Sequence, residues 1–177
     1  MNRGKKLLLA FSTCQLAVSS VGWAQDLPGV VGKHQNDPGE TFAIEHLLSV
    51  YTKSVSDGNE AAFSSILLND RVPFSSTDEL HLAKADPLHM QMSHYSDFKH
   101  IVFESGRHFE QTFYNVRIEQ DGDLAQVSLD FVTKDTRTHS GGYGWKSLTL
   151  LKVKGLWKIA SEFYTVYSLP QDTGPNH

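Results

Sequence analysis

The second half of the chain alternates apolar and polar residues with a period of two, which is typical of β-strands. The alternation holds over residues 99–109, 112–120, 124–135, 144–153 and 156–167, and we predict a strand in each. Asp121-Gly122 and Lys154-Gly155 are tight-turn sequences, and residues 138–142 connect the third strand to the fourth. Three consecutive hairpin connections predict an antiparallel, strongly bent sheet.

The first half has the apolar spacing of helices. The segment from Glu40 to Asp57 places five apolar residues on one helical face: Ile44, Leu47, Leu48, Tyr51 and Val55. Gly58 is placed to end this helix in a left-handed cap, and Asn59 can cap a second helix. Residues 72–74 form a short extended piece, which Pro73 confines to a sheet edge.

A third helix is predicted to start at Asp86-Pro87, with Leu88, Met92 and Tyr95 on one side. Helices that precede strands along the chain are typical of the α+β class. We therefore expect a curved antiparallel sheet wrapped by three N-terminal helices, which forms a cone with an internal pocket.

The N-terminus has the layout of a secretory signal peptide. Arg3, Lys5 and Lys6 precede a mostly apolar stretch, and Gly22-Trp23-Ala24 has small residues at the −3 and −1 positions of a cut after Ala24. We predict a signal peptide over 1–24, a flexible leader over 25–39, one domain over 40–168 and a tail over 169–177. The alternatives are an uncleaved anchor, for which the apolar run is short, and a lipoprotein signal at Cys14.

Cleavage would change the charge and the redox chemistry. The first 24 residues contain three of the 16 basic residues and none of the 20 acidic ones, so the mature chain would carry a net charge of −7. This charge argues against nucleic acid as a partner. Cys14 is the single cysteine and would leave with the signal peptide, which excludes a disulfide, a thiol nucleophile and a thiolate metal site. We expect a periplasmic or secreted protein without a stable membrane anchor.

Three segments resemble the nuclear transport factor 2-like superfamily. Residues 51–74, "YTKSVSDGNEAAFSSILLNDRVPF", look like its first two helices and first strand. Residues 117–131, "RIEQDGDLAQVSLDF", look like its central hairpin, and residues 147–168, "SLTLLKVKGLWKIASEFYTVYS", look like its closing hairpin. The resemblance implies a cone of sheet closed by helices, with a pocket at the wide end and a homodimer formed through the outer face of the sheet. Members include ketosteroid isomerases, dehydratases, SnoaL-like polyketide cyclases and pocket proteins without a known reaction, so function must be argued from the site.

Side-chain alternation suggests which residues line the pocket. On the last strand, Trp157 and Phe163 belong to the bulkier apolar set that should face inward, and Glu162 belongs to the outer set. The glycine-rich run 140–144 reads as a flexible lip over the pocket mouth, next to two aromatic residues. The predicted ligand-binding residues are Tyr51, Tyr95, Tyr143, Trp145, Trp157 and Phe163.

Candidates for proton transfer are acids and histidines that burial would bring towards a neutral pKa. Asp130 is unusual because acids are depleted in strands, although a solvated or interface acid is the alternative interpretation. His94 and His108 belong to a group of five histidines between residues 81 and 108. The predicted catalytic residues are Asp130, His94 and His108, and no pair of residues has the spacing of the isomerase base and tyrosine.

The histidines do not have metal-ligand spacing. Met90 and His94 could share a helical face, which gives only two ligands, and the chain has no HxxxH or HExxH sequence. We therefore expect no metal and no cofactor. The sequence predicts an exported protein whose pocket binds a small, largely apolar ligand, and the alternative is a cofactor-free cyclase, isomerase or dehydratase that uses the same pocket.

Overall fold

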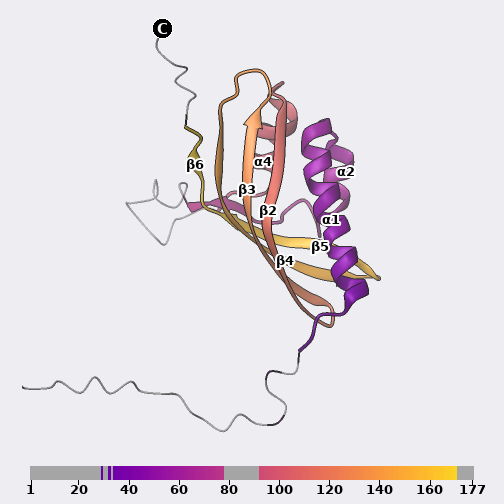
Figure 1. Ribbon diagram of the computed structural model, residues 1–177. Coiled ribbons are helices and arrows are strands. Elements are labelled where there is room, and N and C mark those ends of the chain that lie inside the picture. Colours follow the sequence, from indigo (N-terminus) through magenta and orange to yellow (C-terminus); the bar gives the residue numbers. More distant parts are fainter. Residues whose placement is uncertain (1–28, 30–31, 33, 78–91, 171–177) are drawn as a thin grey trace, which may run out of the picture. The chain divides into compact units, whose positions relative to one another are not determined.

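The computed structural model describes residues 29, 32, 34–77 and 92–170 (Figure 1). The predicted signal peptide and the predicted start of the third helix at Asp86-Pro87 lie outside these residues. The elements below all belong to the unit His34–His177. Within the described residues, no helix is long and apolar enough to cross a membrane.

The first two helices form where the sequence predicts them. Helix α1 (Pro38–Asp57) begins at Asp37, whose side chain accepts hydrogen bonds from the backbone N–H groups of Gly39 and Glu40. Gly58 ends this helix with a left-handed φ of 65°. Helix α2 (Glu60–Ser65) starts immediately afterwards and is capped by the side chain of Asn59.

The prediction of a strand over 99–109 is wrong. This segment forms helix α4 (Tyr95–Lys99) and a π-helical turn, η2 (His100–Glu104). Its β-branched and aromatic residues favour a strand locally, but Phe98 and Phe103 both pack against Phe63 of α2, with ring centroids 5.0 and 5.4 Å away. Tertiary packing therefore overrides local propensity here.

The remaining strands form one bent sheet. Its strands are β1 (Phe74–Ser76), β2 (Phe109–Asp121), β3 (Leu124–Asp135), β4 (Gly141–Val153), β5 (Leu156–Tyr164) and β6 (Tyr167–Ser168). The order is β1-β5-β4-β3-β2, with β6 also paired to β4, and only the β1–β5 pair is parallel. Figure 1 shows the long strands curving past α1 and α2, which lie on one side of the sheet. The predicted α+β class and curved antiparallel sheet are confirmed.

A β-bulge in β5 reverses the expected facing of its second half. Thr149 pairs with Ser161, but the next residue, Leu150, pairs with Ile159, so Ala160 is the extra residue. Ile159 points into the core before the bulge, and Glu162 points inward after it; both are fully buried. The prediction that Glu162 lies on the outer face is therefore wrong.

The glycine-rich run lies in β4 and is not a loop. A Cβ atom at Gly141 would lie 2.0 Å from the carbonyl oxygen of Thr133, and one at Gly144 would lie 1.9 Å from the carbonyl oxygen of Thr165. These glycines let β4 lie close to the backbone at Thr133 on one side and at Thr165 on the other. The run therefore closes the sheet instead of forming a lip.

The core lies between α1, α2, α4 and the inner face of the sheet. Phe63 is at its centre, fully buried, with aromatic neighbours on several sides. Its ring partners are Tyr51, Phe74, Tyr95, Phe98 and Phe103. This aromatic cluster fixes the short helices to the sheet.

Candidate functional site

A cavity of about 440 Å³ lies between the helices and the inner face of the sheet, and we call it the chamber. Its lining is mostly apolar and aromatic: Val55, Phe74, Phe98, Ile101, Val102, Phe109, Phe131, Tyr164 and Val166. Asp97, Arg107 and Ser140 also line it and are exposed, which places them at the mouth. Lys146 and Glu162 line it as well but are buried, which places them deep inside.

These two charged residues form a buried cluster with Tyr51. Lys146 Nζ lies 2.6 Å from Glu162 Oε1 and donates a hydrogen bond of 2.9 Å to the hydroxyl of Tyr51. The Tyr51 hydroxyl in turn donates to Glu162 Oε1 over 3.1 Å. We call these three residues the buried triad, and it joins α1, β4 and β5.

Aromatic rings surround the ammonium group of Lys146. Its Nζ lies 4.8 Å from the ring centroids of Tyr51 and Phe131, 5.4 Å from that of Tyr164 and 5.6 Å from that of Phe113. Such contacts partly replace the water that the ammonium has lost. The lysine is thus held by a carboxylate, a hydroxyl and ring faces together.

The second carboxylate oxygen of Glu162 is different. Glu162 Oε2 is buried and has no hydrogen-bond partner among the described residues. A buried acceptor without a partner is costly, and such an atom in a native protein calls for an explanation. Glu162 lines the chamber, so this unpaired acceptor belongs to the chamber wall.

The environment shifts two of the pKa values in the triad. Burial raises the pKa of Tyr51 well above its usual value, and the adjacent Glu162 carboxylate raises it further. Burial lowers the pKa of Lys146, although Glu162 opposes this shift. Tyr51 therefore remains a hydrogen-bond donor over the physiological pH range.

This shift predicts loss of stability in alkaline solution. Above about pH 10 an unfolded tyrosine loses its proton while buried Tyr51 keeps it, so the unfolded state binds fewer protons and the free energy of unfolding falls as pH rises. We expect the urea concentration at the unfolding midpoint to fall as the pH is raised from 9 to 11. The fall should be less steep in Tyr51→Phe. If the urea midpoint fell equally steeply with pH in that variant, Tyr51 would not be the source of the alkaline loss of stability.

At the mouth, Arg107 forms an ion pair with Asp135. Arg107 Nε lies 2.9 Å from Asp135 Oδ2, and the guanidinium lies 4.7 Å from the centroid of the Phe109 ring. The hydrogen bond from Arg107, together with those from the backbone N–H groups of Arg137 and Thr138, holds the pKa of Asp135 well below its usual value. The ion pair therefore holds the Arg107 side chain in place at the mouth of the chamber, and Asp135 keeps its negative charge at neutral pH.

The predicted ligand-binding residues fall into two groups, and only Tyr51 belongs to the buried triad. Tyr95 is buried among the core aromatics, and its hydroxyl donates to Glu60 over 2.8 Å. Trp157 is also buried, and its indole N–H donates to Glu40 over 2.8 Å.

The other predicted ligand-binding residues are on the outer face of the sheet. Tyr143, Trp145 and Phe163 alternate with inward residues and are 43%, 51% and 37% exposed. The predicted catalytic residue Asp130 lies opposite Trp145 on this face and accepts a hydrogen bond of 2.6 Å from Asn115. The structure therefore separates these four residues from the chamber.

The two predicted catalytic histidines lie outside the chamber lining. His94 is the N-cap residue of α4, where its backbone N–H donates to Asp97 over 2.9 Å. His108 is exposed just before β2, and its carbonyl accepts a hydrogen bond from the N–H of Thr136. Across the described parts of the chain, no group of three or more histidine, cysteine or acidic residues could hold a metal ion.

Sequence reasoning missed Lys146 and Glu162. The alternation does place Lys146 on the same face as Leu148 and Leu150, and a charged residue in an apolar strand face was a signal that it needs a partner. That partner could not be identified, because the bulge at Ala160 reverses the facing of Glu162.

Comparisons with known proteins agree with this geometry. The sequence matches no family profile and no curated protein. Solved structures do match: an NTF2-like protein of unknown function from Shewanella baltica has a TM-score of 0.52 and 17% identity, and the match covers 78% of this chain and 100% of that one.

Two proteins from Novosphingobium aromaticivorans also match. A candidate scytalone dehydratase has a TM-score of 0.57 and 16% identity, with 77% of this chain and 90% of that chain covered. A candidate aromatic ring hydroxylase has a TM-score of 0.59 and 13% identity, with 76% and 96% covered. These likenesses, together with the helix-covered bent sheet and its chamber, show that the chain has the nuclear transport factor 2-like fold.

Proposed function

We propose that the chamber binds a small, largely apolar molecule that carries a hydrogen-bond donor. The observation that carries this proposal is Glu162 Oε2, a buried acceptor without a partner among the described residues. A ligand hydroxyl or N–H group would supply the missing hydrogen bond. The aromatic lining would hold the rest of the ligand, and the volume of about 440 Å³ lies within the usual range for small-molecule pockets.

The proposal is tested with two ligands of similar size, 2-naphthol and 2-methylnaphthalene. Calorimetry with the purified protein should show tighter binding of the naphthol, by about tenfold, because only the naphthol can donate to the carboxylate. In a variant with Lys146→Met and Glu162→Leu together, both ligands should bind equally. Equal binding by the unaltered protein would overturn the proposal, and circular dichroism would confirm that the double variant is folded.

A second candidate function is proton transfer without a cofactor. It is favoured by the carboxylate of Glu162, which lies within hydrogen-bond reach of the Tyr51 hydroxyl inside an apolar cavity. A carboxylate with a free oxygen could remove a proton from a bound carbonyl compound. A candidate scytalone dehydratase has the same fold, so dehydratase chemistry belongs to this second candidate.

Hydrogen–deuterium exchange at the α-carbon of 2-tetralone, followed by NMR, separates the two candidates. Catalysis predicts exchange that the protein accelerates and that falls at least a hundredfold in Glu162→Gln. Binding without catalysis predicts the solution rate in both proteins.

We also propose that two copies associate through the outer face of the sheet. Exposed aromatic side chains gather there: Tyr114, Tyr143, Trp145, Phe163 and Tyr167. We expect light scattering after size exclusion to give a dimer for the unaltered protein and a monomer for Trp145→Glu. Lys53→Gln, a substitution at an exposed position of α1, should leave the dimer intact. A monomeric unaltered protein would refute the proposal.

We further propose that the protein is exported and cut after Ala24, as the charged start and the small residues of the predicted signal peptide suggest. Intact-mass measurement of protein recovered from the periplasm or medium should give a mature chain that begins at Gln25. Recovery of the full-length chain from the cytoplasm alone would contradict this proposal.

A further inference from the structure

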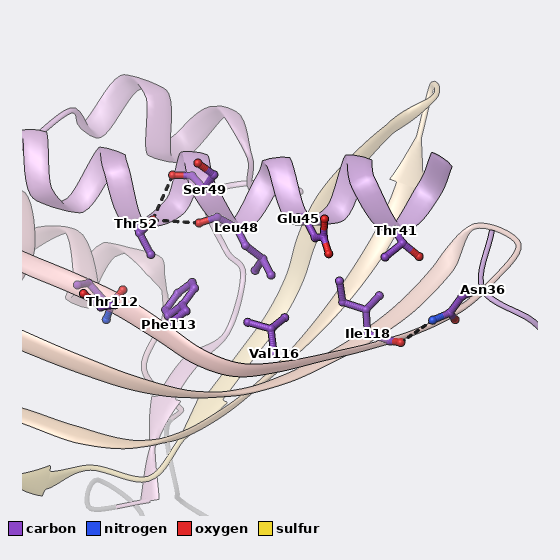
Figure 2. A pocket seen from close by; sticks show the side chains of 11 residues that line it. Asn36, Thr41, Glu45, Leu48, Ser49, Thr52, Thr112, Phe113, Val116 and Ile118 are labelled. Atoms are coloured by element: carbon purple, nitrogen blue, oxygen red, sulfur yellow. Dashed lines mark hydrogen bonds between the residues drawn. The ribbon is translucent and has the colours of Figure 1, made fainter. Parts of the chain in front are cut away.

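A second cavity lies in the gap between α1 and the edge strand β2, and we call it the groove. Its volume is about 650 Å³. Strand β2 is the last strand of the sheet order, so its outer edge is free of a further strand among the described elements. Figure 2 shows Leu48 pointing down from α1 towards Phe113, Val116 and Ile118 of β2. These four side chains give the groove an apolar middle.

The shape of β2 creates this apolar surface. A bulge between Tyr114 and Arg117, with Asn115 at a φ of 50°, interrupts the pairing with β3. Val116 lies within the bulge, faces α1 in Figure 2 and remains 40% exposed. An apolar side chain that lines a cavity and stays this exposed is available for contact with a ligand.

One end of the groove has an unsatisfied polar atom. The Gln111 side chain is only 8% exposed, and its Nε2 donates to Thr133 Oγ1 over 2.7 Å. Its Oε1 is buried and has no partner among the described residues. Gln111 lines both the groove and the chamber, so its amide belongs to the wall between them. This oxygen is therefore an unpaired acceptor in the wall at this end of the groove.

The other end has a negative charge. Glu45 on α1 lines the groove and is exposed, and no lysine or arginine is among the described residues that line it. In Figure 2, Glu45 lies over the Val116–Ile118 end, whereas Thr52 lies over Thr112 and Phe113, next to Gln111 in the chain. Glu45 and Thr52 are seven positions apart, which corresponds to about 10 Å along a helix at about 1.5 Å per residue.

We propose that the groove is a second binding site, which takes an elongated organic amine with a hydrogen-bond donor at its far end. The ammonium group pairs with Glu45, the apolar body lies on Leu48, Phe113 and Val116, and the far donor satisfies Gln111 Oε1. Linear diamines and amino alcohols have this chemistry. The site does not depend on the ligand proposed for the chamber.

Calorimetry with three linear probes tests the ligand class: 1,6-diaminohexane, 1-aminohexane and hexanedioate. We expect the diamine to bind about five- to tenfold more tightly than the monoamine, because only the diamine reaches Gln111 Oε1. The dicarboxylate should not bind, since it would face Glu45. Equal binding of diamine and monoamine, or binding of the dicarboxylate, would overturn the proposal.

Variants test the place of the site. Glu45→Gln should weaken diamine binding about three- to fivefold, as expected for an exposed ion pair, and Val116→Lys should abolish it by adding a cation to the groove. Glu119→Gln, which makes the same charge change at an exposed position of β2, should have no effect. Unchanged diamine binding in Val116→Lys would refute the groove as the site. All three variants should keep the affinity for 2-naphthol. Because 2-naphthol tests the chamber and the diamine tests the groove, failure of one proposal can be told apart from failure of the other.

Discussion

Replacing Glu162 with glutamine is expected to lower the free energy of unfolding by about 3 to 5 kcal/mol. The substitution keeps the size of the side chain but removes the charge that lies 2.6 Å from Lys146 Nζ. Lys146 is 2% exposed, so its ammonium would remain in the core without a counter-ion. The Tyr51 hydroxyl would also lose its charged acceptor. The triad therefore stabilises the fold only as a complete set.

Urea unfolding followed by circular dichroism measures this effect. The double variant with Lys146→Met and Glu162→Gln should recover most of the lost stability, because it removes both buried charges. Glu110→Gln, at an exposed position, should change the free energy of unfolding by less than about 0.5 kcal/mol. A loss below about 1 kcal/mol in Glu162→Gln would show that the pair is not buried as described.

The substitution Phe63→Ala is expected to cost about 3 to 5 kcal/mol, as other large-to-small changes of buried aromatic residues do. Phe63 is fully buried, and its ring contacts join α2 to α4, to β1 and to Tyr51 of α1. Alanine would leave a cavity at the point where these elements meet. The short helices α2 and α4 have six and five residues, and helices of this length depend on packing for their stability.

The matched control is Phe42→Ala on α1, where the side chain is 72% exposed and the same atoms are removed from the surface. It should change the free energy of unfolding by less than about 0.5 kcal/mol. If Phe63→Ala does not fold, Phe63→Leu should still show a smaller loss of about 1 to 2 kcal/mol. Similar effects at positions 42 and 63 would contradict the central role of Phe63.

Much of the fold could be predicted from local chemistry. The stripe from Ile44 to Val55, Gly58 and Asn59 predicted α1, its left-handed end and the start of α2. Turns at Gly122 and at Lys154-Gly155, all with positive φ, closed the expected hairpins. In each case the signal lay within a few neighbouring residues.

The site could not be predicted in the same way, because it depends on contacts between distant segments. Residues 99–104 have strand-like side chains, but they form a π-helical turn whose Phe103 packs against distant Phe63. Lys146 and Glu162 are 16 positions apart, and their meeting requires the register of β4 with β5. Tyr51 is the predicted site residue that does contribute to the triad. Its position on the apolar face of the predicted helix already indicated that its side chain points into the core.

The β-bulge in β5 determines which side chains form the chamber wall. If all residues were kept but the bulge were absent, the strand would continue its alternation, so Phe163 would turn inward and Glu162 would face solvent. Lys146 would then lose its counter-ion, and an apolar side chain would replace the carboxylate in the chamber wall. Deletion of Ala160 itself would remove the bulge but leave Glu162 two positions after Ile159, so this deletion should keep Glu162 facing inward. A relative that shares these residues but lacks the bulge would therefore have an apolar chamber wall in place of an ionic one.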